Sequence, residues 1–209
     1  MLSQAQVAEL LSPFGLALTP EQISRLQTYL ELLLRWNRKI NLTALRSPQE
    51  CVTRHFGESL YLSRWVELRG RLLDIGSGAG FPGLALKIVF PALAVTLLEP
   101  VAKKRAFLKE VVRFCRMESV DVRGERLERF LNLRPAPSFD AASARAVDQL
   151  DQLVPLAAEC LRLGGRLCLW VSHEQAANLR QASGRLAWAS AIPVPLSRQR
   201  EIWIGTRVR

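Results

Sequence analysis

The sequence predicts an α/β protein in which helices cover a doubly wound, mostly parallel sheet, with a helical extension at the N-terminus. Three observations predict this class. From residue 71 onward, short apolar runs alternate with stretches of helical spacing, the pattern of a parallel sheet built from right-handed crossovers. A glycine-rich turn follows the first apolar run, at the place where such sheets bind ligands. Before residue 67, apolar residues recur only at the three- and four-residue spacing of helices.

The N-terminal segment, residues 1–66, is therefore expected to be helical. Ser3 can cap a first helix. The stretch Thr19-Pro20-Glu21-Gln22 predicts the start of a second helix, because proline suits the first helical position and the glutamine can complete a capping box. The apolar face of this helix continues to about Asn37, and a third helix is expected after Ser47-Pro48.

Residues 67–209 are expected to form one α/β domain. At its end, residues 186–194 and 200–207 predict two strands around a short turn that leaves no room for a helix. A terminal antiparallel hairpin on a parallel sheet is typical of the Rossmann-like class I methyltransferase fold, whereas a dehydrogenase would ordinarily close its sheet with another βαβ unit. The earlier strands are expected at 71–75, 94–98, 119–123, 139–143 and 166–171, and the helices at 82–90, 101–116 and 149–162.

Glycine stands at every second position after the first strand, in the stretch from Asp74 to Gly83. The spacing Asp74-x-Gly76-x-Gly78-x-Gly80 is typical of methyltransferases that use S-adenosylmethionine. From Gly78 the chain also satisfies G-x-G-x-x-G, the dinucleotide fingerprint, so NAD is the alternative cofactor. The carboxylate of Asp74 suits a cationic, phosphate-free ligand better than a pyrophosphate. This favours S-adenosylmethionine over NAD. A turn without a ligand is disfavoured, because so many glycines cost backbone entropy.

A second acid follows the next strand, where Val95 to Leu98 runs into Glu99. A carboxylate there can accept both ribose hydroxyls of an adenosine, which holds for either cofactor. Asp74 has two interpretations: it contacts the amino group of the methionine moiety, or it holds the glycine turn through backbone amides.

Composition limits the class of protein. The 209 residues are 49% hydrophobic and 23% charged, as in ordinary soluble domains. The apolar runs are too short to span a membrane, and the first residues lack the pattern of a signal peptide. Four cysteines stand far apart without a C-x-x-C pair, so we expect no metal site, no disulfide framework and a cytoplasmic protein.

The net charge of +10 is unusual, and most of the basic residues are arginine. Arginine binds phosphate bidentately and stacks on bases, so a nucleic-acid partner is favoured. Arginine enrichment by a GC-rich genome is the alternative explanation.

Longer stretches resemble one family. Residues 35–60 contain Arg-Trp-Asn-Arg-Lys-Ile-Asn-Leu-Thr-Ala-Leu-Arg, followed by Arg54-His55-Phe56 and Ser59-Leu60, and are similar to the N-terminal signature of the RsmG (GidB) family. The resemblance continues through Asp74 to Gly83, Thr96 to Leu108, Arg126 to Phe130 and Ser143 to Ala146, which is nearly the whole chain. It implies a methyltransferase that uses S-adenosylmethionine and acts on N7 of the guanosine at position 527, in ribosomal numbering, of 16S rRNA. The implied partner is the small ribosomal subunit on the side of the N-terminal helices, with no membrane and no obligate protein partner.

The resemblance also implies site residues. The resemblance places cofactor contacts at Gly76, Phe81, Glu99, Pro100, Val101, Leu127, Glu128 and Arg145, and the spacing of the glycine loop adds Asp74, Gly78 and Gly80. No catalytic residue is assigned, because N7 of guanine carries a lone pair and no proton, so that methyl transfer needs positioning and no general base. Basic side chains near the loop and the following helix are candidate RNA contacts: Arg35, Arg38, Lys39, Lys103 and Lys104.

Three positions depart from the family pattern. Glu99 stands where many members have Asp, Ser143-Ala144-Arg145 is one residue looser than the usual Ser-Arg, and Trp170 to Glu174 replaces a common Lys-Gly pair. Arg145 is expected to contact cofactor or RNA, or to pair with Asp140 or Asp148. His55 is expected to pack or to hydrogen-bond between helix and domain, with substrate contact as the alternative. His173 is expected to begin a helix.

Two other functions stay open. The chain can be a methyltransferase acting on another RNA or a small molecule. It can also be a non-catalytic RNA-binding or ribosome-assembly protein on the same scaffold, although a vestigial pocket would have no need of so many glycines.

Overall fold

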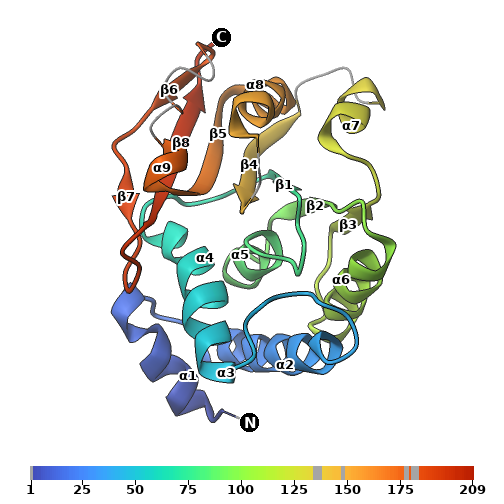
Figure 1. Ribbon diagram of the computed structural model, residues 1–209, viewed down its shortest axis with the longest axis vertical. Coiled ribbons are helices and arrows are strands. Elements are labelled where there is room, and N and C mark those ends of the chain that lie inside the picture. Colours follow the sequence, from blue (N-terminus) through green and yellow to red (C-terminus); the bar gives the residue numbers. More distant parts are fainter. Residues whose placement is uncertain (1, 134–137, 147–148, 177–178, 180–183) are drawn as a thin grey trace.

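The computed structural model describes residues 2–133, 138–146, 149–176, 179 and 184–209 (Figure 1). Its strands are β1 (Arg71–Ile75), β2 (Ala94–Leu98), β3 (Val120–Arg123), β4 (Phe139–Arg145), β5 (Leu161–Ser172), β6 (Leu186–Trp188), β7 (Ile192–Pro193) and β8 (Arg200–Arg207). They form one sheet in the order β3-β2-β1-β4-β5-β8-β6, with β7 paired to β8. Pairing among β1 to β5 is parallel, whereas β8 runs antiparallel to β5, β6 and β7. The predicted fold class is confirmed.

The helices divide into an N-terminal group and the crossovers of the sheet. The N-terminal group is α1 (Gln4–Leu11), η1 (Ser12–Phe14), α2 (Pro20–Asn37), α3 (Pro48–Glu50), η2 (Cys51–Gly57), α4 (Glu58–Leu60) and η3 (Tyr61–Arg64). The others are α5 (Gly83–Val89), α6 (Ala102–Phe114), α7 (Leu127–Leu133), α8 (Leu150–Cys160) and α9 (His173–Ala176). In the part of the chain that the structure describes, no helix has both the length and the apolar character needed to cross a membrane.

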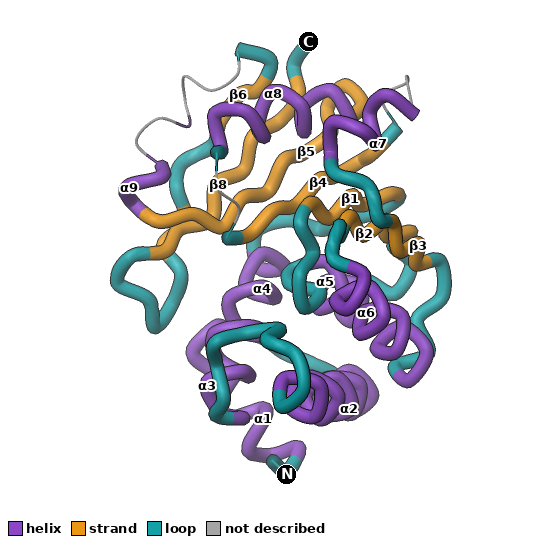
Figure 2. Tube along the Cα trace, turned by 45° about the vertical axis from the view of Figure 1, so that its right-hand side comes forward, coloured by secondary structure: helices purple, strands orange, loops and turns teal. Residues whose placement is uncertain are grey.

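The sheet separates two layers of helices (Figure 2). Helices α7 and α8 cover one face, α5 and α6 cover the other, and the N-terminal helices pack beyond α5 and α6. Because strand side chains alternate between faces, Leu72 joins the core that includes the N-terminal helices, and Leu73 joins the core beneath α8. The first core runs without interruption from Val7 in α1 to the sheet, so the N-terminal segment is packed against the face that carries α5 and α6.

The helix starts agree with the capping signals. Ser3 and Thr19 each form a complete capping box, and α2 has the predicted bounds. After Ser47 the chain stays helical from α3 to η3, as predicted, but the stretch η2 has π-helical hydrogen bonding. Such wider turns are rare in proteins, and those that occur are often at functional sites. His173 begins α9, as predicted.

Some boundaries were wrong. The strand expected at 186–194 is two strands, because residues 189–191 carry one residue more than the opposing stretch of β8 and interrupt the pairing. The strand expected at 166–171 begins at Leu161, directly after α8, which therefore ends two residues earlier than predicted. Helix α7 was not predicted.

Candidate cofactor site

The glycine loop leaves β1 at the carboxyl edge of the sheet. Gly76, Gly78 and Gly80 have φ of 68°, 55° and 87°, the left-handed region that favours glycine. A Cβ on Gly78 would meet only the carbonyl oxygen of Gly76, 3.8 Å away, so this side of the loop faces open space. A Cβ on Gly80 would lie 2.2 Å from the hydroxyl of Tyr29. One glycine thus leaves room for a ligand, and the other leaves room for α2.

Asp74 lies fully buried beneath this loop. Its Oδ1 accepts a hydrogen bond of 2.7 Å from the Ser143 hydroxyl on β4, and its Oδ2 is buried without a hydrogen-bond partner among the described residues. Burial raises the pKa of Asp74 to about 6, while hydrogen bonding from Ser143 opposes that rise. Oδ2 faces Gly83 at the start of α5, where a Cβ would lie 2.7 Å from it, and the Gly83 backbone also opposes the rise in the pKa of Asp74. An unpaired buried acceptor is costly, so a further donor that reached Oδ2 would be favoured.

Glu99 lies at the carboxyl end of β2 and is also buried. Its Oε2 accepts from the Gly78 amide at 2.9 Å, and its Oε1 accepts from the Val101 amide at 2.8 Å. Arg105 donates to the carbonyl oxygens of Glu99 and Pro100 and fixes the same turn. The second acid therefore joins the glycine loop to the turn after β2. In the sequence Arg105 looks like one more basic residue of a helix, so this role was missed.

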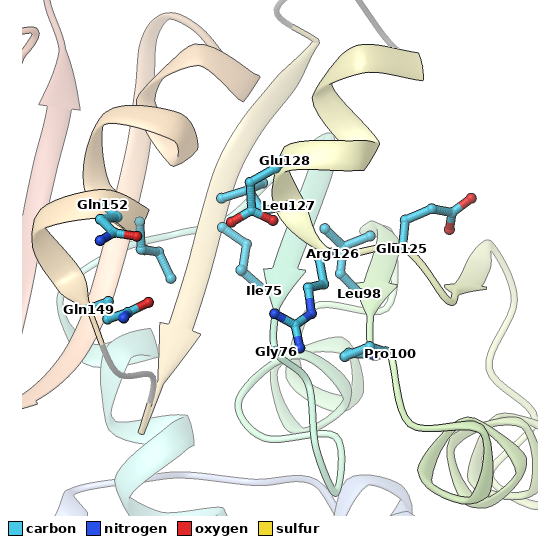
Figure 3. A pocket seen from close by; sticks show the side chains of 11 residues that line it. Ile75, Gly76, Leu98, Pro100, Glu125, Arg126, Leu127, Glu128, Gln149 and Gln152 are labelled. Atoms are coloured by element: carbon cyan, nitrogen blue, oxygen red, sulfur yellow. The ribbon is translucent and has the colours of Figure 1, made fainter.

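A cavity of about 190 Å³ opens between the ends of β1 and β2 and the first turns of α7 and α8 (Figure 3). It brings together four predicted positions, Gly76, Pro100, Leu127 and Glu128. Its other lining residues were not predicted: Ile75, Leu98, Glu125, Arg126, Gln149, Gln152 and Leu153.

Polar side chains approach this cavity from two sides. Figure 3 shows Arg126 extending toward Gly76 and Pro100, whereas Glu125 points away from them. Gln149 and Gln152 lie across the cavity at the start of α8. Arg126 could have been suspected, because it lies beside two residues carried over from the family. Nothing in the sequence marks the two glutamines.

Phe81 is buried in an aromatic group beside the loop. Its ring stacks on Tyr29 at 5.2 Å and 4° and on His55 at 4.7 Å and 15°, and Phe56 meets it edge-on at 5.0 Å. The Phe81 side chain therefore belongs to the core, and its predicted cofactor contact is left to its backbone. His55 packs as predicted, with Nε2 2.7 Å from the Thr43 hydroxyl.

Arg145 turns toward the N-terminal helices. Its guanidinium donates to Glu58 Oε2 at 2.9 Å, to Ser59 Oγ at 3.0 Å, and to the carbonyl oxygens of Arg54 and His55. Burial lowers the pKa of Arg145 to about 10, which still leaves it charged at neutral pH.

The pairing of Arg145 with Asp140, an alternative to a cofactor or RNA contact, is wrong, because Asp140 binds the Arg71 amide and the Arg162 side chain at the opposite edge of the sheet. Asp148, the other predicted partner, lies outside the described residues.

Glu58 is the centre of the cluster of polar side chains around Arg145. Its Oε2 also accepts from Arg200 Nη1 at 2.5 Å, and its carbonyl accepts from Trp170 Nε1 at 2.7 Å. Burial and the nearby charges of Arg145, Arg200 and Arg54 lower the pKa of His55 to about 3. Positive charge is thus concentrated beside the glycine loop, at the carboxyl ends of β4 and β5.

The predicted RNA contacts are mostly exposed. Arg38, Lys39 and Lys103 lie on the surface, and Lys104 is half-buried. Arg35 is exposed but forms an ion pair with Glu110 of α6, which partly neutralises it. Within the described ranges, no group of three or more His, Cys, Asp or Glu side chains could hold a metal ion.

Several solved structures share this fold. The structure of a fibrillarin/Nop5p complex superposes with a TM-score of 0.60 at 15% identity, covering 73% of this chain and 82% of that chain. A T. thermophilus 16S rRNA N2 methyltransferase, solved in complex with AdoMet and guanosine, superposes with a TM-score of 0.56 at 18% identity over 73% of this chain and 39% of that chain. At these identities the likeness shows the fold alone.

Sequence comparisons are more specific. The family model of rRNA small subunit methyltransferase G matches residues 22–201. The ribosomal RNA small subunit methyltransferase G of Chloroflexus aggregans is 43% identical over 161 residues, covering 76% of this chain and 68% of the relative. That of Syntrophotalea carbinolica is 34% identical over 193 residues, covering 92% and 89%. The chain belongs to the rRNA small subunit methyltransferase G family.

Proposed function

We propose that this chain transfers a methyl group from S-adenosylmethionine to N7 of a guanosine in 16S rRNA, the residue at position 527 in ribosomal numbering. One observation carries the proposal for the cofactor: two buried carboxylates, Asp74 and Glu99, lie at the carboxyl ends of neighbouring strands on either side of an open glycine loop. This edge of an open α/β sheet is where such proteins bind ligands. Family membership carries the proposal for the substrate.

The residues at this edge fit the cofactor. S-adenosylmethionine combines an ammonium group with an adenosine, and Asp74 Oδ2 is a buried acceptor that lacks a donor among the described residues. Each Glu99 oxygen uses one lone pair on a backbone amide and keeps another for a ribose hydroxyl. Ile75 and Leu127 supply apolar walls suited to an adenine. A pyrophosphate would instead meet two carboxylates, which disfavours NAD.

The chemistry asks the protein for positioning. Bound S-adenosylmethionine supplies an electrophilic methyl group on its sulfonium. N7 of guanine offers an in-plane lone pair and no proton, so the reaction needs no general base. Holding both reactants in line lowers the barrier by several kcal/mol. His55 packs against Phe81 and does not line the cavity, and burial lowers its pKa to about 3.

Basic side chains on the substrate side suit a polyanion. Arg38, Lys39 and Lys103 are exposed, and Arg54 adds an exposed guanidinium beside Arg145 at the carboxyl end of β4. Phosphate contacts of this kind release counterions, so affinity for RNA falls with salt. Ribosomal subunits lie in the cytoplasm, and we propose that location for the enzyme.

Substitution of Gly78 tests the cofactor site. Gly78→Val adds a side chain at φ 55° that projects into the open side of the loop. Gly164→Val is the matched control, because Gly164 has φ 75° and no atom within 4 Å of the place that a Cβ would take, but lies at the other edge of the sheet. Both variants are expected to lose about 1–2 kcal/mol of stability through backbone strain. In titration calorimetry, only Gly78→Val is expected to weaken the binding of S-adenosylmethionine, by tenfold or more. If Gly78→Val and Gly164→Val bind it with equal affinity, the proposed site is contradicted.

Mass spectrometry of 16S rRNA tests the substrate. A strain without this gene is expected to lack one N7-methylguanosine, and the wild type and Gly164→Val are expected to restore it while Gly78→Val does not. An unchanged modification map would refute the assignment to 16S rRNA. Labelled methyl transfer to purified small subunits separates the remaining functions: cofactor binding without transfer to any RNA would indicate a non-catalytic assembly protein.

A further inference from the structure

The N-terminal helices contact the cofactor loop directly, through Tyr29 in the middle of α2. This side chain is fully buried, and its hydroxyl donates a hydrogen bond of 2.5 Å to the carbonyl oxygen of Ala79. Burial raises the pKa of Tyr29 well above its usual value, so the hydroxyl is a donor at physiological pH. Fifty residues of sequence separate donor and acceptor.

The bonded carbonyl lies at the turn of the loop. Ala79 stands between Gly78 and Gly80, which both have positive φ. On the inner side of the same turn, the Gly80 amide donates to the Ser77 carbonyl oxygen at 2.6 Å. The peptide between Ala79 and Gly80 is therefore held at both its oxygen and its nitrogen, and only the oxygen depends on a residue from outside the loop.

Ring packing continues the same contact. Phe81, the next residue of the loop, is stacked between Tyr29 of α2 and His55 of η2. A Tyr29 ring without its hydroxyl would still stack on Phe81. The hydrogen bond and the stack can therefore be separated experimentally.

We propose that Tyr29 is a positioning residue of the cofactor site, whose hydroxyl holds the Ala79 carbonyl and keeps the glycine loop in the conformation that receives the cofactor. The inference rests on the proposed function, in which this loop binds S-adenosylmethionine. Without the hydroxyl, part of the population adopts other loop conformations, and the apparent dissociation constant rises by the inverse of the competent fraction.

Tyr29→Phe tests the hydroxyl while keeping the ring. Loss of one hydrogen bond is expected to raise the Kd for S-adenosylmethionine about three- to tenfold. The KM for S-adenosylmethionine should rise with it, while the KM for small subunits and kcat at saturating cofactor stay unchanged. Tyr61→Phe is the matched control: it removes the other tyrosine hydroxyl of the chain, and its ring packs edge-on against Phe14 and Trp65, neither of which belongs to the loop.

The outcomes separate the two proposals. A folded Tyr29→Phe protein that binds the cofactor as tightly as Tyr61→Phe overturns the role of Tyr29 and leaves the proposed function standing. A wild-type protein that does not bind S-adenosylmethionine overturns the proposed function. If Tyr29→Phe does not fold, hydrogen exchange of the wild type, followed by NMR, decides. The probe is the Tyr29 hydroxyl proton, which donates to the Ala79 carbonyl oxygen. A hydroxyl proton that exchanges slowly before cofactor is added supports a loop held by Tyr29, and fast exchange that slows only on binding overturns it.

Discussion

Among the charged residues outside the glycine loop, Glu58 is the one whose substitution is predicted to lower the stability of the fold most. Its Oε2 accepts from Arg145 at 2.9 Å and from Arg200 at 2.5 Å. The Glu58 side chain is only 5% exposed, and those of Arg145 and Arg200 are 9% and 35% exposed. Glu58→Gln keeps the size and one acceptor but removes the only charge that compensates two guanidinium groups in this cluster of described residues.

The loss of unfolding free energy in Glu58→Gln can be estimated from the unequal exposure of Arg145 and Arg200. Arg200 can turn toward water when its partner is lost, but Arg145 cannot, and breaking a buried ion pair costs about 3–5 kcal/mol. We therefore expect the free energy of unfolding to fall by about 3 kcal/mol. For a chain of this size, that change lowers the urea midpoint by about 1 M.

Glu67→Gln is the matched control in urea unfolding. Its ion pair with Arg69 has a similar length, 2.8 Å, but the side chains are 65% and 81% exposed. Such surface pairs contribute about 0–1 kcal/mol. If Glu58→Gln and Glu67→Gln lower the midpoint equally, Glu58 does not compensate buried charge and the reasoning is refuted.

Three further predictions concern charge. The pKa of His55 falls from 6.5 to about 3 on folding, so the native state binds fewer protons than the unfolded state between these pH values. The free energy of unfolding should therefore fall as pH drops through this range. In urea unfolding, His55→Asn should lose less stability over the same range. Because the pKa of Asp74 is about 6, the affinity for the cofactor, measured by calorimetry, should fall about tenfold per pH unit below pH 6. In Asp74→Asn the affinity should be weak and should not change with pH over this range. Arg54→Gln should raise the KM for small subunits and lower the salt slope by about 1, whereas the exposed Arg69→Gln should do neither.

Local signals predicted most of the fold. The bounds of α2 follow from a capping box and a proline at its start, and those of β1 and β2 from short apolar runs that end at an acid. The same locality explains the errors. Helix α7 is short and has no capping signal, and the division between β6 and β7 depends on register with β8, which no single stretch of sequence encodes.

The candidate site could be proposed from the sequence where a motif carries it, but not where it depends on contacts between distant residues. Asp74, Glu99 and the glycines stand in one recognisable spacing. Glu58 looks like an ordinary polar residue of a helix, because the arginines that bury it are 87 and 142 residues away. Tyr29 fits the apolar face of α2, and nothing in the spacing shows that its hydroxyl reaches the loop.

The family resemblance itself has a physical explanation in these contacts. Its N-terminal signature and its glycine loop are separate stretches of sequence, yet the structure packs one against the other. His55 stacks on Phe81, and Ser59 accepts a hydrogen bond from Arg145, at the end of β4. A substitution in the helices therefore changes the packing of the cofactor loop, and a change in the loop disturbs the helices. Residues that look like an RNA-binding extension in the sequence thus pack against the glycine loop, which is why the loop alone does not define the candidate site.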